Sequence, residues 1–532
     1  DLSVENGILV TRAKRWPLMI DPQEQANKWV KNMEARNGLR MIKLSDGNFL
    51  RTLEGAIRIG SPVICEDLGE DIDPALEPVL LKAVVQQGGR QILRLGETDV
   101  DYDENFRFYM TSKLPNPHYL PELCIKVTLI NFTVTITGLE DQLLGDVVAQ
   151  ERPDLEETKN KLVISMASDA KQLKDLEDKT LALLQSSEGN ILDNEPLINT
   201  LNNSKLTSGV IQGRVADAEK TEISINEARE GYRTVATRGS LLYFVIADLG
   251  LLDPMYQYSL EYFKQLFNYC IEVSEKSDDL ATRLQTVIDY VTYFVYLTVC
   301  RGLFERHRLI YSFLICTSVM RNAGKIAFEA WNFLLRGAGA MTVGAGPNPD
   351  DSWITAGGWD LLNALETLVP NEFTGFVEDF QRNIAEWQEW FDDPAPHTIP
   401  LPGVWGMVPT EDSPNEQYLG SFMKMLVMKA LKPDKLSFAM GNYVAEMLGE
   451  RFTEVPPLQL QDIFGDTSPT VPTVFVLSTG ADPTKMLLDF AEEKGFMSTM
   501  SIISLGAGQG PIAENLIAQG VKKGQWVCLQ NC

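Results

Sequence analysis

The sequence has few of the residues that build metal centres and disulfide frameworks. Its 532 residues include only three histidines, His118, His307 and His397, which lie far apart along the chain. Seven cysteines are present, but no pair has the C-x-x-C spacing of a metal or redox motif, and most lie in apolar runs as buried free thiols do. We therefore predict no metal site and a reducing compartment.

The chain also lacks positive charge and long apolar runs. Its formal net charge is −26, whereas binding to nucleic acid needs a basic surface that neutralises phosphates. An acidic membrane surface would be repelled as well, and no uninterrupted apolar run approaches the roughly 18 residues of a membrane span. We therefore expect no nucleic-acid partner and no membrane partner.

The length indicates several domains. A chain of 532 residues is expected to hold roughly three or four domains. It begins at Asp1 without Met and stops at Cys532, shortly after the apolar run Trp526–Leu529. We expect it to be a segment of a longer polypeptide, in which no targeting signal can be sought.

The stretch Trp16–Asn27 has the order strand, turn, helix that a phosphate-binding loop needs, but it lacks that loop's glycines and lysine. A working loop has the pattern G-x-x-x-x-G-K-[ST], in which backbone N–H groups close on phosphate oxygens. Acidic side chains in the turn would repel phosphate. We predict a degenerate nucleotide loop, whose candidate residues are Asp21, Pro22, Gln23, Glu24, Gln25 and Ala26.

Helices and short apolar strands alternate after this turn, which predicts a parallel sheet flanked by helices. A helix is expected over Glu24–Arg36, and a strand over Pro62–Leu68 ends in acidic residues. In a nucleotide hydrolase a strand-end aspartate, here Asp67, would hold Mg²⁺, and a following glutamate would activate water. Leu68 stands in the following position, although Glu66 or Glu70 could reach the same place.

A second polar candidate follows the predicted strand Phe106–Ser112. Asn116 could contact a γ-phosphate or the attacking water there, and the alternative is an ordinary Asn-Pro turn. No arginine occurs between Arg107 and Arg152, so this stretch offers no arginine finger to a neighbour.

The region from about 149 to 235 changes to long, charged helices. Leu155, Leu162, Asp169, Leu176 and Leu183 recur every seven residues, so one acidic residue interrupts an apolar seam. After a break at 186–190, a second helical stretch carries Leu197, Leu201, Leu206, Val210 and Val215. We predict an antiparallel coiled-coil hairpin; the alternative is two ordinary helices packed on the core.

The region from about 236 to 470 is predicted to be helical. The glycine-rich segment 337–346 indicates a linker, because it opens no strand-to-helix turn with a lysine. Aromatic residues at helical spacing favour core packing. Nothing in this region has catalytic spacing, so we predict no catalytic residue.

The last region, from about 471, repeats the opening design. An apolar strand over 472–477 is expected to lead into a turn, a helix over Met486–Lys494 and two further strands, Met500–Leu505 and Gln525–Leu529. The turn has one glycine and a Thr-Lys pair in reversed order, so it also predicts a degenerate loop. Its candidate residues are Gly480, Ala481, Asp482, Pro483, Thr484 and Lys485.

Several separate runs resemble one family. Arg15–Pro22, Asn116–Glu122, Met255–Leu260 and Gly480–Thr484 resemble the dynein heavy chains, most closely the axonemal ones, and the resemblance covers essentially the whole chain. It implies AAA+ modules with helical lids and a coiled-coil hairpin. The fifth module's loop would fall on Asp21–Ala26, with Gly usual in the family where this chain has Glu24; the strand-end acid would be Asp67, the sensor-like residue Asn116 and the sixth module's loop Gly480–Lys485.

The resemblance also implies a domain order: a large AAA+ subdomain (1–148, fifth ring module), a strut or buttress (149–235), a helical small subdomain (236–340), a helical connecting region (341–470) and the start of the sixth module (471–532). The implied function is a structural, force-transmitting part of an ATP-driven microtubule motor of the axoneme. The alternative is a regulatory nucleotide-binding module that gates the motor's ATPase.

The implied partners are neighbouring modules and the stalk of the same chain, with microtubules and with intermediate and light chains through the full motor. We expect no cofactor in this segment, since ATP and Mg²⁺ would serve other modules. The expected location is the cytoskeleton of the cilium or flagellum.

Overall fold

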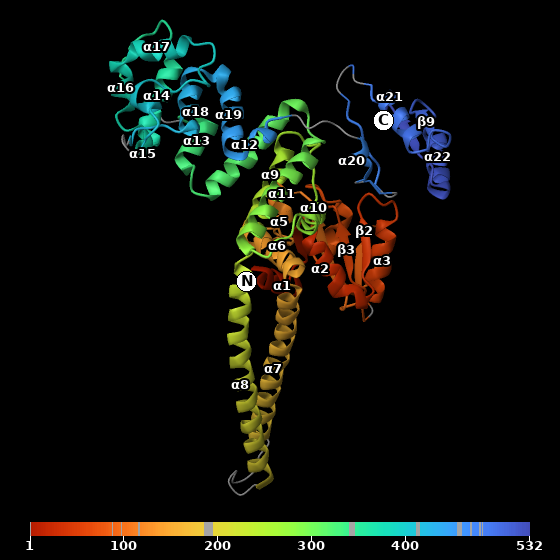
Figure 1. Cartoon of the computed structure of the whole chain (residues 1–532). Helices are drawn as coiled ribbons and strands as arrows, with labels where there is room; N and C mark the ends of the chain where they lie inside the picture. Colours follow the sequence, from red (N-terminus) through yellow and green to blue (C-terminus); the bar gives the residue numbers. More distant parts are fainter. Residues whose placement is uncertain are drawn as a thin grey trace. The chain divides into compact units, whose positions relative to one another are not determined.

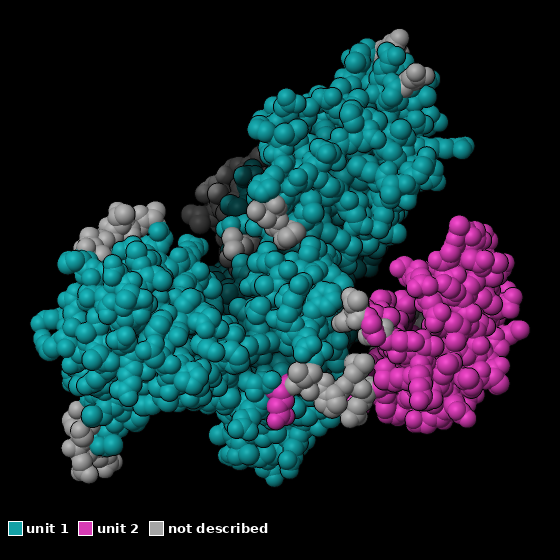
Figure 2. All heavy atoms as spheres, turned by 90° about the horizontal axis from the view of Figure 1, so that it is seen from above, with its two compact units in different colours: residues 1–453 teal, residues 454–532 magenta. Residues whose placement is uncertain are grey.

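The computed structural model describes residues 2–87, 89–96, 98–114, 117–185, 195–339, 346–410, 415–454, 460–465, 467–468, 471–477, 480 and 482–532. The chain forms two compact units, residues 1–453 and 454–532, which Figure 2 colours teal and magenta. Helices dominate both units (Figure 1). The domain boundaries drawn from the sequence stay predictions.

Unit 1 begins with a five-stranded parallel sheet in the order β2-β3-β7-β1-β8. The strands are β1 (Pro17–Ile20), β2 (Arg40–Lys43), β3 (Val63–Glu66), β7 (Phe108–Ser112) and β8 (Thr128–Asn131). The helices around it are α1 (Leu2–Arg12), α2 (Gln25–Glu34), α3 (Phe49–Ile59), α4 (Glu77–Leu80) and α5 (Pro121–Cys124). The predicted parallel sheet flanked by helices is confirmed.

Alternate residues of each strand face opposite sides of this sheet, as the two-residue period of a strand requires. Met19 of β1 packs with Val30 of α2, whereas its neighbour Leu18 packs with Leu53 of α3. The α3 side also carries a three-stranded antiparallel sheet that we did not expect, in the order β4-β5-β6. Its strands are β4 (Val84–Gln87), β5 (Arg90–Leu95) and β6 (Thr98–Asp101).

Two long helices, α7 (Pro153–Gln185) and α8 (Glu195–Glu230), pack side by side (Figure 1). On α7 the expected seam residues Leu162, Leu176 and Asp169 are half-buried or buried. On α8 the prediction is wrong for Leu206 and Val210, which are exposed, whereas Val215 is half-buried as expected. The side chains of Leu183, Leu197 and Leu201 lie outside those that the structure describes.

The protected side of α8 follows a different seven-residue spacing. It is formed by Ser208, Ile211, Val215, Ala218, Glu222, Ile225 and Arg229. Small and charged residues stand in this row, so choosing the largest apolar residues selected the wrong face. Asp169 is not simply a flaw in the seam, because its carboxylate lies 2.7 Å from the guanidinium of Arg214 on α8.

The rest of unit 1 is helical and shares one hydrophobic core, which runs from Val134 to Phe452. Its helices are α6 (Ile136–Glu151), α9 (Arg233–Asp248), α10 (Leu260–Val273), α11 (Leu280–Cys300), α12 (Glu305–Asn322), α13 (Phe328–Arg336), α14 (Ala356–Leu368), α15 (Pro370–Phe373), α16 (Phe376–Arg382), α17 (Ile384–Asp392), α18 (Ser421–Leu431) and α19 (Leu436–Leu448).

The stretch Arg233–Leu251, which includes α9, is long and apolar enough to cross a membrane by length and composition, although we expected no such segment. Half of its most apolar window is buried in the structure, and α9 packs on α6, α11 and α12. A core helix meets the same criteria.

Unit 2 contains α20 (Leu460–Gly465), α21 (Thr484–Glu493), β9 (Ser501–Ser504), α22 (Gly510–Lys523) and β10 (Val527–Gln530). β9 and β10 pair in parallel, and the ring of Trp526 packs on Phe464, Phe490 and Phe496. The predicted strand over 472–477 is wrong. Residues 472–477 pair with no described strand, and Val474 is 78% exposed. An extended segment needs a hydrogen-bonded neighbour to become a stable strand.

Candidate functional site

The first predicted loop lies at the carboxyl edge of the five-stranded sheet, where ligands of open α/β sheets bind. Asp21 follows β1, Asp67 follows β3, Lys113 follows β7 and Lys43 ends β2. Because these strands are parallel, their carboxyl ends meet at one edge. The fold therefore brings together the two acidic candidates and two lysines that the sequence analysis did not select.

Asp21 occupies the start of α2 in the way that a bound anion would. Its side chain is buried, and its two carboxylate oxygens accept hydrogen bonds of 2.8 Å from the backbone N–H groups of Gln25 and Asn27. Helix N-termini bind anions because their first N–H groups lack partners within the helix. Burial raises the pKa of Asp21, and this effect outweighs the opposing effect of the backbone donors. The chain's own carboxylate thus fills the anion cradle.

Glu24 lies in the same turn with a left-handed backbone, at φ 57°. This conformation favours glycine, which is the residue that the resemblance implies at this position. Glu24 does not stand uncompensated, because its carboxylate lies 2.6 Å from the ammonium group of Lys113. That hydrogen bond is the main cause of the raised pKa of Lys113.

The strand-end acid is also neutralised. The carboxylate of Asp67 lies 2.6 Å from Lys43 and 3.2 Å from Lys113. Burial alone would raise the pKa of Asp67, but hydrogen bonds from the two lysines outweigh it and lower the pKa.

The two glutamates that could replace a water-activating residue are both engaged. Glu66 accepts a hydrogen bond of 2.9 Å from Asn27 and pairs with Lys31 at 2.6 Å. These partners lower the pKa of Glu66 against the effect of burial. Glu70 accepts a hydrogen bond from the backbone N–H of His118.

The first loop as arranged does not fit a magnesium nucleotide. The backbone donors that would hold phosphate oxygens point at Asp21, and a further carboxylate, Glu24, stands in the turn. Asp67, which would hold the metal, is occupied by two lysines. Within the described ranges, no group of three or more His, Cys, Asp or Glu residues is placed to hold a metal ion.

In the second predicted loop, too, a carboxylate of the chain accepts a hydrogen bond from the start of the helix that follows. The carboxylate of Asp482 accepts a hydrogen bond of 2.9 Å from the backbone N–H of Thr484, the first residue of α21. Bonds from the hydroxyl and the N–H of Thr484 lower the pKa of Asp482. Gly480 has φ 85°, and Pro483 and Lys485 frame the helix start.

The two strand-end turns also correspond. Asn531 follows β10 at φ 56°, as Asp67 follows β3 at φ 57°. Asn531 donates a hydrogen bond of 2.8 Å to the hydroxyl of Ser504 at the end of the neighbouring strand, where Asp67 instead meets Lys43. An amide thus replaces the acid at this turn of unit 2.

Two sequence candidates, Asn116 and Ala481, lie outside the described residues. Pro22 and Gln23 lie in the turn before α2, and Ala26 lies in the first turn of α2. The amide oxygen of Gln23 accepts a hydrogen bond from Val134 N–H. The sequence analysis missed Lys31, Lys43 and Lys113. A usable signal existed for Lys43 and Lys113, since each ends or directly follows an apolar strand.

The comparisons with known proteins agree along the chain. A family model described as the ATP-binding dynein motor region matches residues 1–211, and one described as the dynein heavy chain region D6 P-loop domain matches residues 468–532. The whole chain aligns with human dynein axonemal heavy chain 6 at 50% identity, with human dynein axonemal heavy chain 1 at 48% and with mouse dynein axonemal heavy chain 2 at 44%.

The chain spans 13%, 12% and 12% of the length of these three relatives. The two family models both describe dynein heavy chains and match in the expected order. The identity of 50% to one such chain over the whole sequence agrees with them. The chain therefore belongs to the dynein heavy chain family, with its similarity to the axonemal members, and corresponds to part of their motor region.

Proposed function

We propose that this segment is a structural, force-transmitting part of an axonemal dynein motor, in which neither of its two loops turns over nucleotide. The observation that carries the proposal is the buried carboxylate of Asp21, which takes the N–H donors at the start of α2. A phosphate group could bind there only by displacing a carboxylate that is covalently part of the turn. Hydrolysis of ATP would then belong to other modules of the full chain.

The two long helices α7 and α8 are proposed as the brace of the stalk. Two charged pairs lie at their base. Glu156 of α7 lies 3.1 Å from Arg229 of α8, which joins the two helices. Glu151, at the end of α6 just before α7, lies 2.7 Å from Arg283 of α11, which is 3% exposed, and so fixes the end of α6 to the helical body. A buried pair is costly to break, because one partner is left as an uncompensated charge. A firm base lets a displacement of the body move the whole pair of helices.

The outer faces of α7 and α8 carry apolar side chains in contact with solvent. Ile164 is 71% exposed and Val210 is 65% exposed, with further examples at Val163, Leu206 and Ile223. Exposed apolar side chains on both helices are suited to side-on contact with another helical element. We propose the stalk of the same chain as that element, with microtubules as the track of the full motor and the axoneme as its location.

The first test is nucleotide binding. We expect no equilibrium binding of a fluorescent ATP analogue with Mg²⁺ to the 532-residue chain at millimolar concentration, and no nucleotide released on denaturation. Micromolar binding would overturn the proposal and favour a regulatory nucleotide site.

The second test addresses the brace in the full heavy chain. Replacing Ile164 and Val210 with Glu should weaken the coupling between microtubule binding and ATPase rate. Leu251→Glu is the matched control, because Leu251 is 87% exposed and lies outside α7 and α8. Equal coupling in both proteins would contradict the brace.

Sliding between the two helices is proposed as the bistable step, with Asp169 as the seam residue that permits it. Asp169→Leu should replace an ion pair to an arginine whose side chain is 56% exposed with apolar burial, and so stiffen the helices. If this variant couples microtubule binding to ATPase rate as the unmodified motor does, register sliding is not the step.

A further inference from the structure

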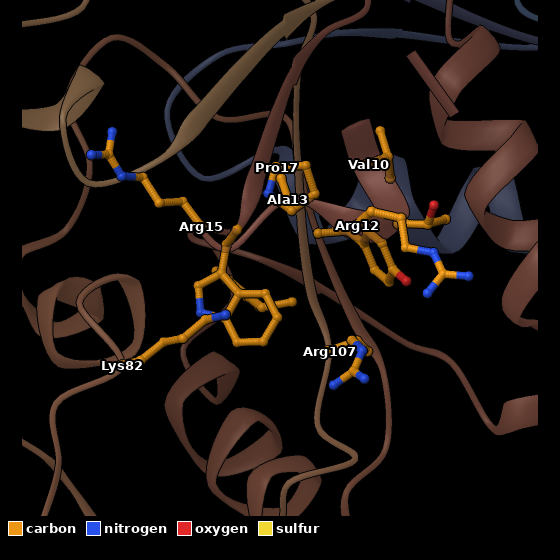
Figure 3. A pocket seen from close by; sticks show the side chains of 11 residues that line it. Val10, Arg12, Ala13, Arg15, Pro17, Lys82 and Arg107 are labelled. Carbon is orange, nitrogen blue, oxygen red and sulfur yellow. The ribbon is translucent and has the colours of Figure 1, made fainter. Parts of the chain in front are cut away.

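A cavity of about 330 Å³ lies at the amino-terminal edge of the five-stranded sheet, at the opposite end of β1 from the candidate site (Figure 3). Three separate segments form it: the end of α1 with the residues before β1, the turn after α4, and the start of β7. Its volume is at the lower end of the range of about 300–1,000 Å³ that ligand pockets occupy. A small ligand fits it better than a nucleotide.

Basic side chains from all three segments line this cavity. Arg12 comes from α1, Lys82 from the turn after α4 and Arg107 from the residue before β7. Arg15 also lines it, but Figure 3 shows its side chain extending away from the other three. None of these four forms an ion pair with a carboxylate of the described residues. In a chain of net charge −26, unpaired cations gathered at one cavity need an explanation.

Lys82 is held in place at a cost to the backbone. Its φ is 51°, a conformation that residues with a side chain rarely adopt and that tends to mark functional sites. Its ammonium group lies 3.8 Å from the ring centre of Trp16 and 2.6 Å from the carbonyl oxygen of Lys14. Burial, and then repulsion by Arg107, lower the pKa of Lys82. Lys82 and Arg107 line the same cavity, so their charges can act on a common ligand.

The polar side chains of the cavity differ in how many hydrogen-bond partners they already have. The hydroxyl of Tyr109 donates a hydrogen bond of 2.7 Å to Glu34, so that carboxylate already has a partner. One terminal nitrogen of Arg107 donates to the carbonyl oxygens of Glu104 and Phe106. The side chain of Arg12 has no hydrogen-bond partner among the described residues.

We propose that this cavity binds a phosphoryl group, through the guanidinium groups of Arg12 and Arg107 and the ammonium group of Lys82. Guanidinium groups match the oxygens of phosphate in pairs, and a lysine adds a compact positive charge. The group could belong to free phosphate or pyrophosphate, or to a phosphorylated side chain. The site lies at the opposite end of β1 from the first loop and does not depend on the proposed function.

The test is isothermal titration of the 532-residue chain with pyrophosphate, inorganic phosphate, O-phosphoserine and, for comparison, acetate at matched ionic strength. We expect pyrophosphate or phosphate to bind, and acetate not to bind. Arg12→Gln and Arg107→Gln should each weaken binding about tenfold or more, since a hydrogen bond to a charged group is worth at least a factor of this size. Binding of O-phosphoserine as tight as that of phosphate would identify a phosphorylated side chain as the source, and binding of the inorganic anions alone a free ligand.

Arg51→Gln is the matched control. Arg51 is exposed on α3 and does not line the cavity, and its replacement removes the same charge. It should leave the affinity within twofold. Unchanged circular dichroism will show that each variant is folded, and Arg12→Gln is the safer variant because Arg12 makes no described side-chain bond. The proposal is overturned if no phosphate compound binds at millimolar concentration, if acetate binds as tightly, or if Arg51→Gln weakens binding as much as Arg12→Gln.

Discussion

Replacing Asp21 with Ala should destabilise the start of α2 and leave an empty anion cradle. The carboxylate accepts hydrogen bonds of 2.8 Å from two backbone N–H groups, and the side chain is 1% exposed. Loss of a helix-capping side chain costs about 0.5–2 kcal/mol, and a buried donor left unpaired costs about 1–3 kcal/mol. We therefore expect a loss of about 2–4 kcal/mol in the stability of this module.

Hydrogen exchange of the amides of Gln25 and Asn27 is the most direct assay, since a chain with several cores does not unfold in one step. Both amides should exchange faster in the variant. Formate should restore their protection, because it supplies the carboxylate that was removed. At ten times its dissociation constant, a ligand that binds only the folded state adds about 1.4 kcal/mol.

The contribution of Asp21 to the free energy of unfolding should change with pH in the opposite direction to that of most carboxyl groups. Burial raises the folded-state pKa of Asp21, so its titration contributes stability that is present below the unfolded pKa and lost as pH rises through the folded pKa. The stability difference between the unmodified chain and Asp21→Ala should therefore widen on acidification. Asp67 has a lowered pKa and shows the opposite sign, with stability that is lost as pH falls.

Three outcomes would refute the reasoning about Asp21. These are unchanged amide exchange in Asp21→Ala, equal protection by formate in both proteins, and a difference between the two proteins that narrows as pH falls toward the pKa of an ordinary carboxyl group.

Three further predictions concern the stability of unit 1. Glu151→Ala should lower the free energy of unfolding by about 3–5 kcal/mol, because it leaves the buried Arg283 unpaired. The control Glu157→Ala removes an exposed pair with Lys161 and should lower it by about 0.5 kcal/mol or less. Urea unfolding of the two variants gives the comparison. Gly358→Ala should lower the free energy of unfolding by about 1–3 kcal/mol, since a Cβ there would lie 2.7 Å from a backbone carbonyl oxygen of α18. Gly357→Ala on the same helix should not destabilise the protein, because a Cβ there would have no atom within 4 Å. Equal melting temperatures of the two variants would contradict this close packing of α14 on α18. Burial lowers the pKa of Lys424 to about 8, so between that value and the ordinary lysine pKa the unfolded state binds more protons than the folded state. As the pH increases over this range, the free energy of unfolding should therefore rise by about 1–2 kcal/mol after allowing for partial exposure. Thermal melts at a series of pH values should show this rise, and Lys424→Met should abolish it.

The regular part of the fold could be predicted from local patterns. The alternation of short apolar strands with helices identified β1, β3 and β7 and the parallel sheet, because burial on two faces imposes a continuous apolar run on each of these strands. The antiparallel strands β4, β5 and β6 were missed, since they are short and polar on the outside. The strand expected over 472–477 fails for the opposite reason: its apolar pattern is right, but no described strand pairs with it.

The helix pair α7 and α8 shows where a pattern within one helix no longer predicts which residues are buried. The seven-residue repeat on α7 selected buried positions correctly, whereas on α8 the large residues Leu206 and Val210 lie in solvent and Ile211 and Ile225 lie inside. A seam is defined by the facing helix, and small or charged residues can occupy it when the partner supplies the matching group. Arg214 does this for Asp169.

The amino-acid sequence by itself determined the family, the sheet class and the absence of the G-x-x-x-x-G-K-[ST] pattern from both loops, because these follow from local order and spacing. Only the tertiary structure decided which side chains take the place of the missing pattern. Asp21 turns back onto the start of its own helix, and Lys113, distant in sequence, neutralises Glu24 and Asp67. Charge compensation depends on distances between separate strand ends, and these distances exist only once the parallel strands have been aligned at one edge.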